Sequence, residues 1–226
     1  SPPQAAVLDV FLAADALGRS IGLLLLAMSV ATWVLILWKS WLLRRAANSL
    51  PLATAAFWQA RDLDDAERRL AAADVQALAL PLLQAARCLL ALPPEVLAAQ
   101  GTPAARLTRA LRDALHHTIA RLQHGQTLLA SVGATAPFVG LLGTVWGVHQ
   151  ALLAVGFGED GFRIEAVAGP VGEALVMTAA GLAVAIPAVL AYNVLGRRIA
   201  QIEAQLEGFA HDLRELFAPS TAGPAP

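Results

Sequence analysis

Three long runs almost free of charged residues constrain this chain more than any other feature. The first lies between Arg19 and Lys39, the second extends from Gly125 to Gly158, and the third extends from Ala166 to Gly196 with Glu173 as its one charge. An α-helix rises about 1.5 Å per residue, so about 20 apolar residues cross a hydrocarbon core of about 30 Å. The sequence therefore predicts an all-α polytopic membrane protein with three transmembrane helices.

Composition supports a membrane protein and gives no sign of an enzyme. Apolar residues make up 57% of the chain and charged residues 15%, whereas about a quarter of a soluble domain is charged. No nucleotide-binding loop, metal-ligand spacing or activated nucleophile is recognisable, and the adjacent His116 and His117 would point about 100° apart on a helix. Cys88 is the only cysteine, which excludes an internal disulfide and favours a small buried apolar side chain. We expect no catalysis, no cofactor and no metal.

The distribution of cations predicts how the chain crosses the membrane. Of the 16 Lys and Arg residues, 11 lie between Lys39 and Arg121, and three follow the third run. The positive-inside rule places both segments in the cytoplasm and the N-terminus on the outer side. The expected order is an outer N-terminus (1–18), a first span (19–43), a cytoplasmic helical loop (44–125), a second span (126–157), an outer loop (158–169), a third span (170–195), and a cytoplasmic amphipathic helix with a disordered tail (196–226).

Capping signals and apolar periodicity predict long helices that extend into the cytoplasm. Asp64 is the expected N-cap of one helix, and Thr102 followed by Pro103 is a typical helix start. Apolar residues recur on one stripe from Leu107 to Leu122, and we identify no breaker between this stripe and the second span. We therefore expect one helix from about Pro103 to about Val155. A similar stripe between Ile199 and Leu216 predicts that the third span continues as an amphipathic helix.

Small residues follow one another at helical spacing in the second and third spans. Such residues let helix backbones approach closely inside a membrane, and we assign helix packing to five glycines: Gly133, Gly140, Gly143, Gly147 and Gly181. Thr144 and Thr178 lie on the same stripes. A threonine hydroxyl in a membrane helix can bond its own backbone or line a narrow polar path. Spacing alone favours bonding to the threonine's own backbone.

Two ionisable residues stand out in the spans. A carboxylate in a membrane costs several kcal/mol unless it is protonated, paired or hydrated, so Glu173 is a functional candidate. Its place close to Gly169–Pro170 leaves open that it marks the outer boundary of the span. His149 lies five residues beyond Thr144, about 140° around the helix, so the two do not share a face. We interpret His149 as an interfacial polar residue.

Three segments resemble the ExbB/TolQ family, which is related to the flagellar stator protein MotA. The segment from Ala136 to Gly147, APFVGLLGTVWG, is similar to the family's second span, and the segment from Val171 to Asn193 is similar to its third. The segment SVATW at Ser29–Trp33, with Lys39 and Ser40, is similar to the first span of the ExbB branch. The loop between the first two spans matches only in length and helical character.

The resemblance implies a pore-forming homopentamer in the bacterial inner membrane, with the second and third spans around the pore. It implies an ExbD-like single-span partner inside the pore, a TonB-like protein that receives the work, and surrounding membrane lipids. Thr144, Glu173 and Thr178 match the family's polar pore positions, which would give the two threonines a functional role. His149 departs from the family pattern. A TolQ-type role in envelope integrity and a purely structural scaffold around the partner's proton path are the alternatives.

Overall fold

The chain forms two compact units that share two helices. The computed structural model describes residues 16–91, 93, 100–156 and 164–218. The first unit comprises residues 1–38 and 125–193, and the second comprises residues 39–124 and 194–226. Helices α2 (Ala16–Trp58) and α7 (Ile164–Phe217) belong to both units. Most of the expected outer N-terminus, half of the expected outer loop and the expected disordered tail lie outside the described residues.

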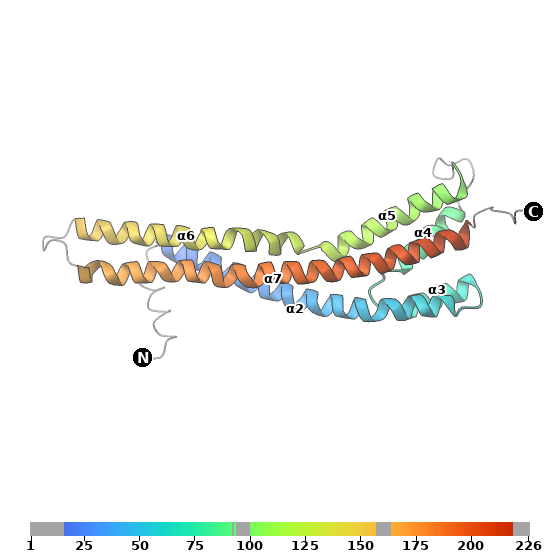
Figure 1. Ribbon diagram of the computed structural model, residues 1–226, viewed down its shortest axis with the longest axis horizontal. Coiled ribbons are helices and arrows are strands. Elements are labelled where there is room, and N and C mark those ends of the chain that lie inside the picture. The colour runs from blue at the N-terminus through green and yellow to red at the C-terminus, as the bar shows by residue number, and fades with distance from the viewer. Residues whose placement is uncertain (1–15, 92, 94–99, 157–163, 219–226) are drawn as a thin grey trace, which may run out of the picture. The chain divides into compact units, whose positions relative to one another are not determined.

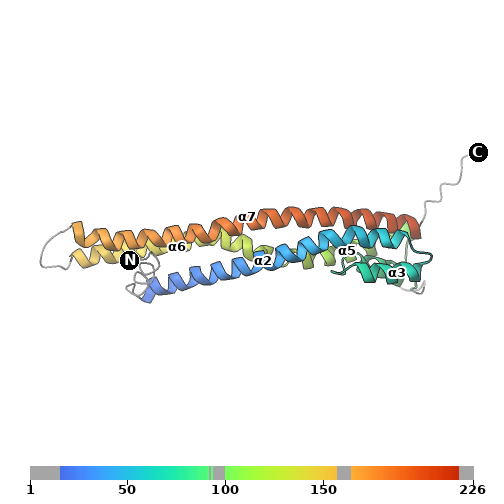
Figure 2. The ribbon, with the colours of Figure 1, turned by 90° about the horizontal axis from the view of Figure 1, so that it is seen from below.

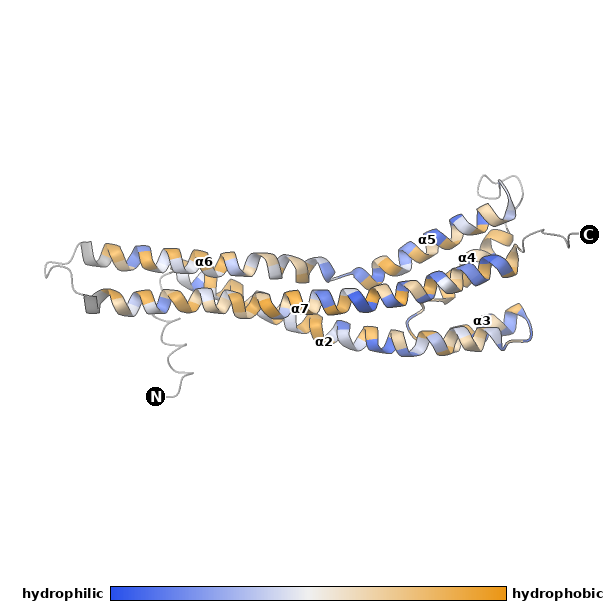
Figure 3. Cartoon of the chain, in the orientation of Figure 1, coloured by the Kyte–Doolittle hydropathy of each residue, from blue (hydrophilic) through white to orange (hydrophobic). Residues whose placement is uncertain are grey.

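In the first unit, α6 (Gln126–Gly156) lies beside the first half of α7, with the first half of α2 against them (Figures 1 and 2). All three helices are long and apolar enough to cross a membrane, which confirms the predicted number of candidate spans. In Figure 3, orange marks the hydrophobic residues of these segments. Their buried core is aliphatic and consists of Ile21, Leu25, Val132, Ala136, Val184, Ala185 and Ala188.

Prolines do not interrupt the helices of the first unit. Pro137 lies inside α6, and Pro170 and Pro187 lie inside α7. A membrane helix tolerates proline where neighbouring groups or local adjustments satisfy the freed carbonyl. Pro137 and Pro187 therefore lie within candidate spans rather than at helix ends.

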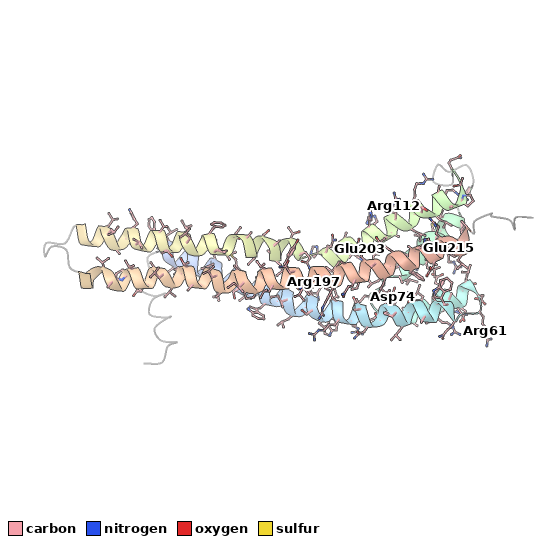
Figure 4. All side chains as sticks on the ribbon, viewed as in Figure 1. Arg61, Asp74, Arg112, Arg197, Glu203 and Glu215 are labelled. Atoms are coloured by element: carbon pink, nitrogen blue, oxygen red, sulfur yellow. The ribbon has the colours of Figure 1, made fainter. Side chains whose placement is uncertain are left out.

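The second unit packs the remaining halves of α2 and α7 with three further helices, α3 (Leu63–Ala73), α4 (Leu80–Leu90) and α5 (Pro103–Gln123). The rings of Phe57 on α2 and Phe209 on α7 meet edge to face, with centroids 5.2 Å apart. The predicted stripes are confirmed as buried on α5 and α7, except that Leu216 is exposed. The charged residues labelled in Figure 4 all belong to this unit.

Side-chain N-caps define the starts of helices α3 and α5 in the second unit. Thr102 Oγ1 accepts a hydrogen bond from Ala105 N at 3.2 Å, and Pro103 follows at the first helical position, as predicted. The prediction of Asp64 as an N-cap is wrong by two residues. Asp62 caps α3 by accepting from Asp65 N at 2.7 Å, because the extended backbone at Asp62 aims its carboxylate at that amide, whereas Asp64 already lies in the first turn.

A buried carboxylate caps α4 from outside the helix. Asp74 is 4% exposed, and its Oδ2 accepts from Ala79 N at 2.7 Å and from Leu80 N at 2.9 Å. The intervening turn requires a positive φ of 49° at Ala77. The carboxylate thereby satisfies backbone donors that would otherwise be unpaired at the start of the helix.

The prediction of one continuous helix from Pro103 to Val155 is wrong. Helix α5 ends at Gln123 and α6 begins at Gln126. Gly125 between them has φ +87°, a left-handed conformation that glycine adopts without steric cost and that ends helices. The helix break could not be recognised in the sequence, because Gly125 is one more small residue of the charge-free run.

Cys88 is exposed, which contradicts the prediction of a buried side chain. It lies on α4, whose buried face is formed by Leu82, Leu83, Ala86 and Leu89. Position 88 falls outside that face, because neighbouring residues on a helix point about 100° apart.

Candidate functional site

The contact between α6 and α7 is close enough to exclude side chains at its centre. A Cβ atom built on Gly140 would lie 2.6 Å from the carbonyl oxygen of Met177 and 3.1 Å from the Cα of Gly181. A Cβ atom on Gly181 would lie 2.6 Å from the carbonyl oxygen of Ala136. These distances are far below van der Waals contact, so the two glycines allow the backbones of the helices to touch.

The other glycines of α6 extend this contact in both directions. A Cβ atom would meet Val189 Cγ2 at 2.6 Å from Gly133 and Ala174 Cβ at 2.7 Å from Gly147. From Gly143 it would meet the Cβ of Met177 at 2.9 Å and Ile21 Cγ2 of α2 at 3.3 Å. The glycine positions thus follow one face of α6 along α7.

Two threonine hydroxyls meet inside this contact. Thr144 Oγ1 and Thr178 Oγ1 are hydrogen-bonded to each other. Thr144 Oγ1 also lies 3.2 Å from Gly140 O on its own helix and 3.2 Å from Ala174 O on α7, and Thr178 Oγ1 lies 3.5 Å from Gly140 O. Both side chains are half-buried. The pair is a polar point within a contact otherwise made of small and aliphatic groups.

The hydrogen-bond partners of the two threonine hydroxyls differ from those expected from spacing alone. Thr144 bonds its own backbone, as expected, and also reaches the opposite helix. The hydroxyl of Thr178 has partners only on α6 among the described residues. Close approach at Gly140 explains this difference, because it brings the carbonyl of that residue within reach of a side chain from α7.

Glu173 lies on α7, five residues before Thr178, and is exposed. Five residues correspond to about 140° around a helix, so the carboxylate and the Thr178 hydroxyl occupy different faces. A Cβ atom added to the nearby Gly169 or Gly172 would meet no described atom within 4 Å apart from its own helical backbone. Among the described residues, the surface around Glu173 is therefore open.

His149 is exposed on α6, and its ring lies 5.6 Å from the ring of Trp146, centroid to centroid, at an interplanar angle of 31°. It does not join the threonine pair, in agreement with the different faces expected for positions 144 and 149. Within the residues that the structure describes, no group of three or more His, Cys, Asp or Glu residues is arranged to hold a metal ion.

Sequence reasoning missed a buried cation in α2. Lys39 is 1% exposed, and its Nζ donates to the carbonyl oxygen of Leu122 at 2.7 Å. Leu122 belongs to the last turn of α5, where carbonyls lack partners within the helix and the helix dipole favours a positive charge. The periodic spacing of Lys39 with the inward-facing Leu43, Ala46 and Leu50 was the available signal.

Two buried polar side chains of the first unit were also missed. Thr32 Oγ1 and both amide atoms of Gln126 have no hydrogen-bond partner among the described residues. Thr32 lies within the first charge-free run, and Gln126 begins α6 directly after the break at Gly125. Neither has a motif that would distinguish it in the sequence.

The sequence pattern of the MotA/TolQ/ExbB proton channel family matches residues 63–208, from α3 to the second half of α7. The chain belongs to this family. The matched residues include the threonine pair, Glu173 and the glycine contact between α6 and α7. A proton channel family is a class of transport proteins rather than of enzymes.

Individual members of this family are similar to the chain over a longer stretch that includes the first span. The biopolymer transport protein ExbB of Xanthomonas campestris is 44% identical over 207 residues, covering 86% of this chain and 79% of the relative. The ExbB protein of Neisseria meningitidis is 41% identical over 207 residues, covering 90% and 93%. The Tol-Pal system protein TolQ of Haemophilus influenzae is 30% identical over 227 residues, covering 97% and 96%. The chain is thus a multi-pass membrane protein of the ExbB/TolQ type.

Proposed function

We propose that this chain is the channel-forming subunit of a proton-driven motor in the bacterial inner membrane. Five copies surround a pore, an ExbD-like single-span partner occupies it, and proton flow does work that a TonB-like protein carries to outer-membrane transporters. The N-terminus is periplasmic and the C-terminus is cytoplasmic, in accordance with the distribution of Lys and Arg residues.

The Thr144–Thr178 hydroxyl pair is the observation that carries this proposal. Both hydroxyls lie in the contact of the two helices that would surround the pore, and each can donate and accept a hydrogen bond along a proton path. The exposed Glu173 lies five residues before Thr178 on α7, which is about 7.5 Å along the helix at about 1.5 Å per residue. It supplies an ionisable group. The five glycines Gly133, Gly140, Gly143, Gly147 and Gly181 hold α6 against α7, so that these polar groups keep their positions.

The ExbB role is favoured over the TolQ role by sequence identity. The two ExbB relatives described above are 41% and 44% identical, against 30% for the TolQ relative. A scaffold that only surrounds the partner's own proton path remains a separate alternative. It would need no hydroxyl pair and no exposed carboxylate in the spans.

The proposal is tested with Glu173→Ala, measured in cells for energised uptake and in membranes for proton flux. We expect both activities to be lost with an unchanged pentamer in native mass spectrometry, because the carboxylate is exposed among the described residues and its removal leaves no buried cavity. Glu207→Ala, which removes an exposed carboxylate from the other end of α7, is the matched control and should keep both activities. Normal uptake and flux in Glu173→Ala would favour the scaffold.

Two further measurements separate the remaining alternatives. A purified chain that gives only monomers or dimers in native mass spectrometry would contradict the pentamer. Rescue of a strain that lacks TolQ, without rescue of one that lacks ExbB, would assign the chain to the envelope-integrity system.

A further inference from the structure

The three cations in the middle of α2 point in different directions and have different partners. Lys39 faces inward and donates to Leu122 O. Arg44 and Arg45 are exposed, and among the described residues neither guanidinium takes part in an ion pair. The sequence between Ala16 and Arg61 contains no Asp or Glu. The charge of the two arginines is therefore not neutralised within their own helix.

These arginines follow directly after the exposed apolar face of α2. That face consists of Leu23, Leu24, Leu26, Val30, Trp33, Val34, Leu37, Trp38 and Trp41. Because Lys39 points inward, this face carries no charge between Arg19 and Arg44, a distance of roughly 37 Å along a helix. Such a length spans the hydrocarbon core and reaches the headgroup layer, so Arg44 and Arg45 lie at the depth of lipid phosphates.

An aromatic ring orients one of the two guanidinium groups. Arg45 Cζ lies 5.3 Å from the centre of the Trp41 ring, a cation–π distance. Stacking on the indole restricts the side chain, and a planar guanidinium presents paired donors that match the geometry of a phosphate. The exposed Leu37 lies one turn before Trp41 and continues this surface toward the membrane interior.

We propose that Trp41, Arg44 and Arg45 form a binding site for the phosphate headgroup of an anionic phospholipid, such as phosphatidylglycerol or cardiolipin. The two guanidinium groups contact the phosphate, and the acyl chains lie along Leu37 and the apolar residues before it. A zwitterionic lipid offers the same phosphate but also a cation that opposes the two arginines. This site depends only on membrane insertion and is independent of the proposed proton pathway.

The experiment compares the purified full-length chain with Arg44→Gln/Arg45→Gln. Binding of phosphatidylglycerol and of phosphatidylcholine is measured by native mass spectrometry, and thermal melting is measured with each lipid. A basic residue near anionic lipid strengthens binding roughly fivefold, so we expect the double variant to bind phosphatidylglycerol up to about 30-fold more weakly. Binding of phosphatidylcholine should change little. Trp41→Leu should have a smaller effect in the same direction.

Arg61→Gln/Arg112→Gln is the matched control, because it removes the same charge from exposed positions after α2 and on α5 (Figure 4). It should retain the preference for phosphatidylglycerol. Equal retention of this lipid by wild type and the Arg44/Arg45 variant would overturn the proposal. So would an equal loss in the control, which would indicate a general charge effect. Stabilisation by inorganic phosphate equal to that by the lipid would assign the site to a free anion instead.

Discussion

The ammonium group of Lys39 donates a hydrogen bond of 2.7 Å to the carbonyl oxygen of Leu122, 83 residues further along the chain. The bond joins the middle of α2 to the last turn of α5, immediately before the break at Gly125. A lysine that marks the end of an apolar run is expected in water or among headgroups. Here it faces the interior of the second unit and satisfies a carbonyl at a helix end.

Lys39→Ala should destabilise the protein by about 2 kcal/mol or more, because it leaves Leu122 O buried without its donor and opens a cavity. Thermal melting in detergent measures this effect. Arg44→Ala five residues later removes the same charge from an exposed position and should change stability by no more than about 0.5 kcal/mol. Equal melting temperatures for Lys39→Ala and wild type would contradict a stabilising role of the bond.

Thr144→Val and Thr178→Val test the hydroxyl pair in the α6–α7 contact. Valine keeps the shape, and an interhelical hydrogen bond in a membrane is worth about 0.6 kcal/mol on average, so melting should change little. If the hydroxyls serve the proton path, proton flux and energised uptake should fall strongly. Thr135→Val is the control, since among the described residues this exposed hydroxyl bonds only Ser131 O on its own helix, at 2.7 Å. Wild-type flux in both test variants would end their assignment to the pathway.

Gly140→Ala should separate α6 from α7. Its Cβ atom would lie 2.6 Å from the carbonyl oxygen of Met177, and overpacking of this kind costs about 1–3 kcal/mol. Gly172→Ala makes the same chemical change on α7, where the added Cβ atom would meet no described residue outside its own helix within 4 Å. Melting should therefore distinguish the two variants, with only the first destabilised. Helix propensity alone would stabilise both variants, because alanine is a better helix former than glycine, so a Gly140→Ala variant at least as stable as wild type would contradict the close contact.

Thr32→Val should raise stability, although it removes a polar group from a helix. Thr32 is 1% exposed, and its hydroxyl has no partner among the described residues. Replacing a buried unpaired hydroxyl by a methyl group of the same shape should gain about 1 kcal/mol. Thr54→Val provides the comparison, because the Thr54 hydroxyl bonds Leu50 O at 3.1 Å and its loss should not stabilise. A lower melting temperature for Thr32→Val would mean that the hydroxyl has a partner in the assembled protein.

Asp74→Ala should cost about 2 kcal/mol, at the upper end of the range for a helix cap, because the carboxylate is buried and accepts from two amides. Asp62→Ala removes the exposed cap of α3, which accepts from one amide, and should cost about 1 kcal/mol or less. Urea or thermal unfolding of both variants gives the comparison. A larger loss for Asp62→Ala would contradict the assignment of Asp74 as the stronger cap.

Features that depend on neighbouring residues in the sequence could be predicted from it. Apolar length predicted the three candidate spans, and the Thr102–Pro103 pair predicted the start of α5. Features that depend on distant residues could not. Nothing local indicates that Lys39 would meet Leu122, or that Asp74 would reach past a turn to the amides of α4. The glycine stripe predicted close packing in general, whereas the contact of Thr178 with α6 follows from which helix faces meet.

The break at Gly125 determines how the polypeptide could be divided experimentally. The chain passes between its two units at three places, of which two lie within the continuous helices α2 and α7 and one lies at His124–Gly125. A protease needs locally unfolded backbone, so the third crossing is the vulnerable one. A cut there leaves both units covalently joined through α2 and α7. Neither unit can be excised as a single stretch of sequence, because each is assembled from two separate stretches of the chain.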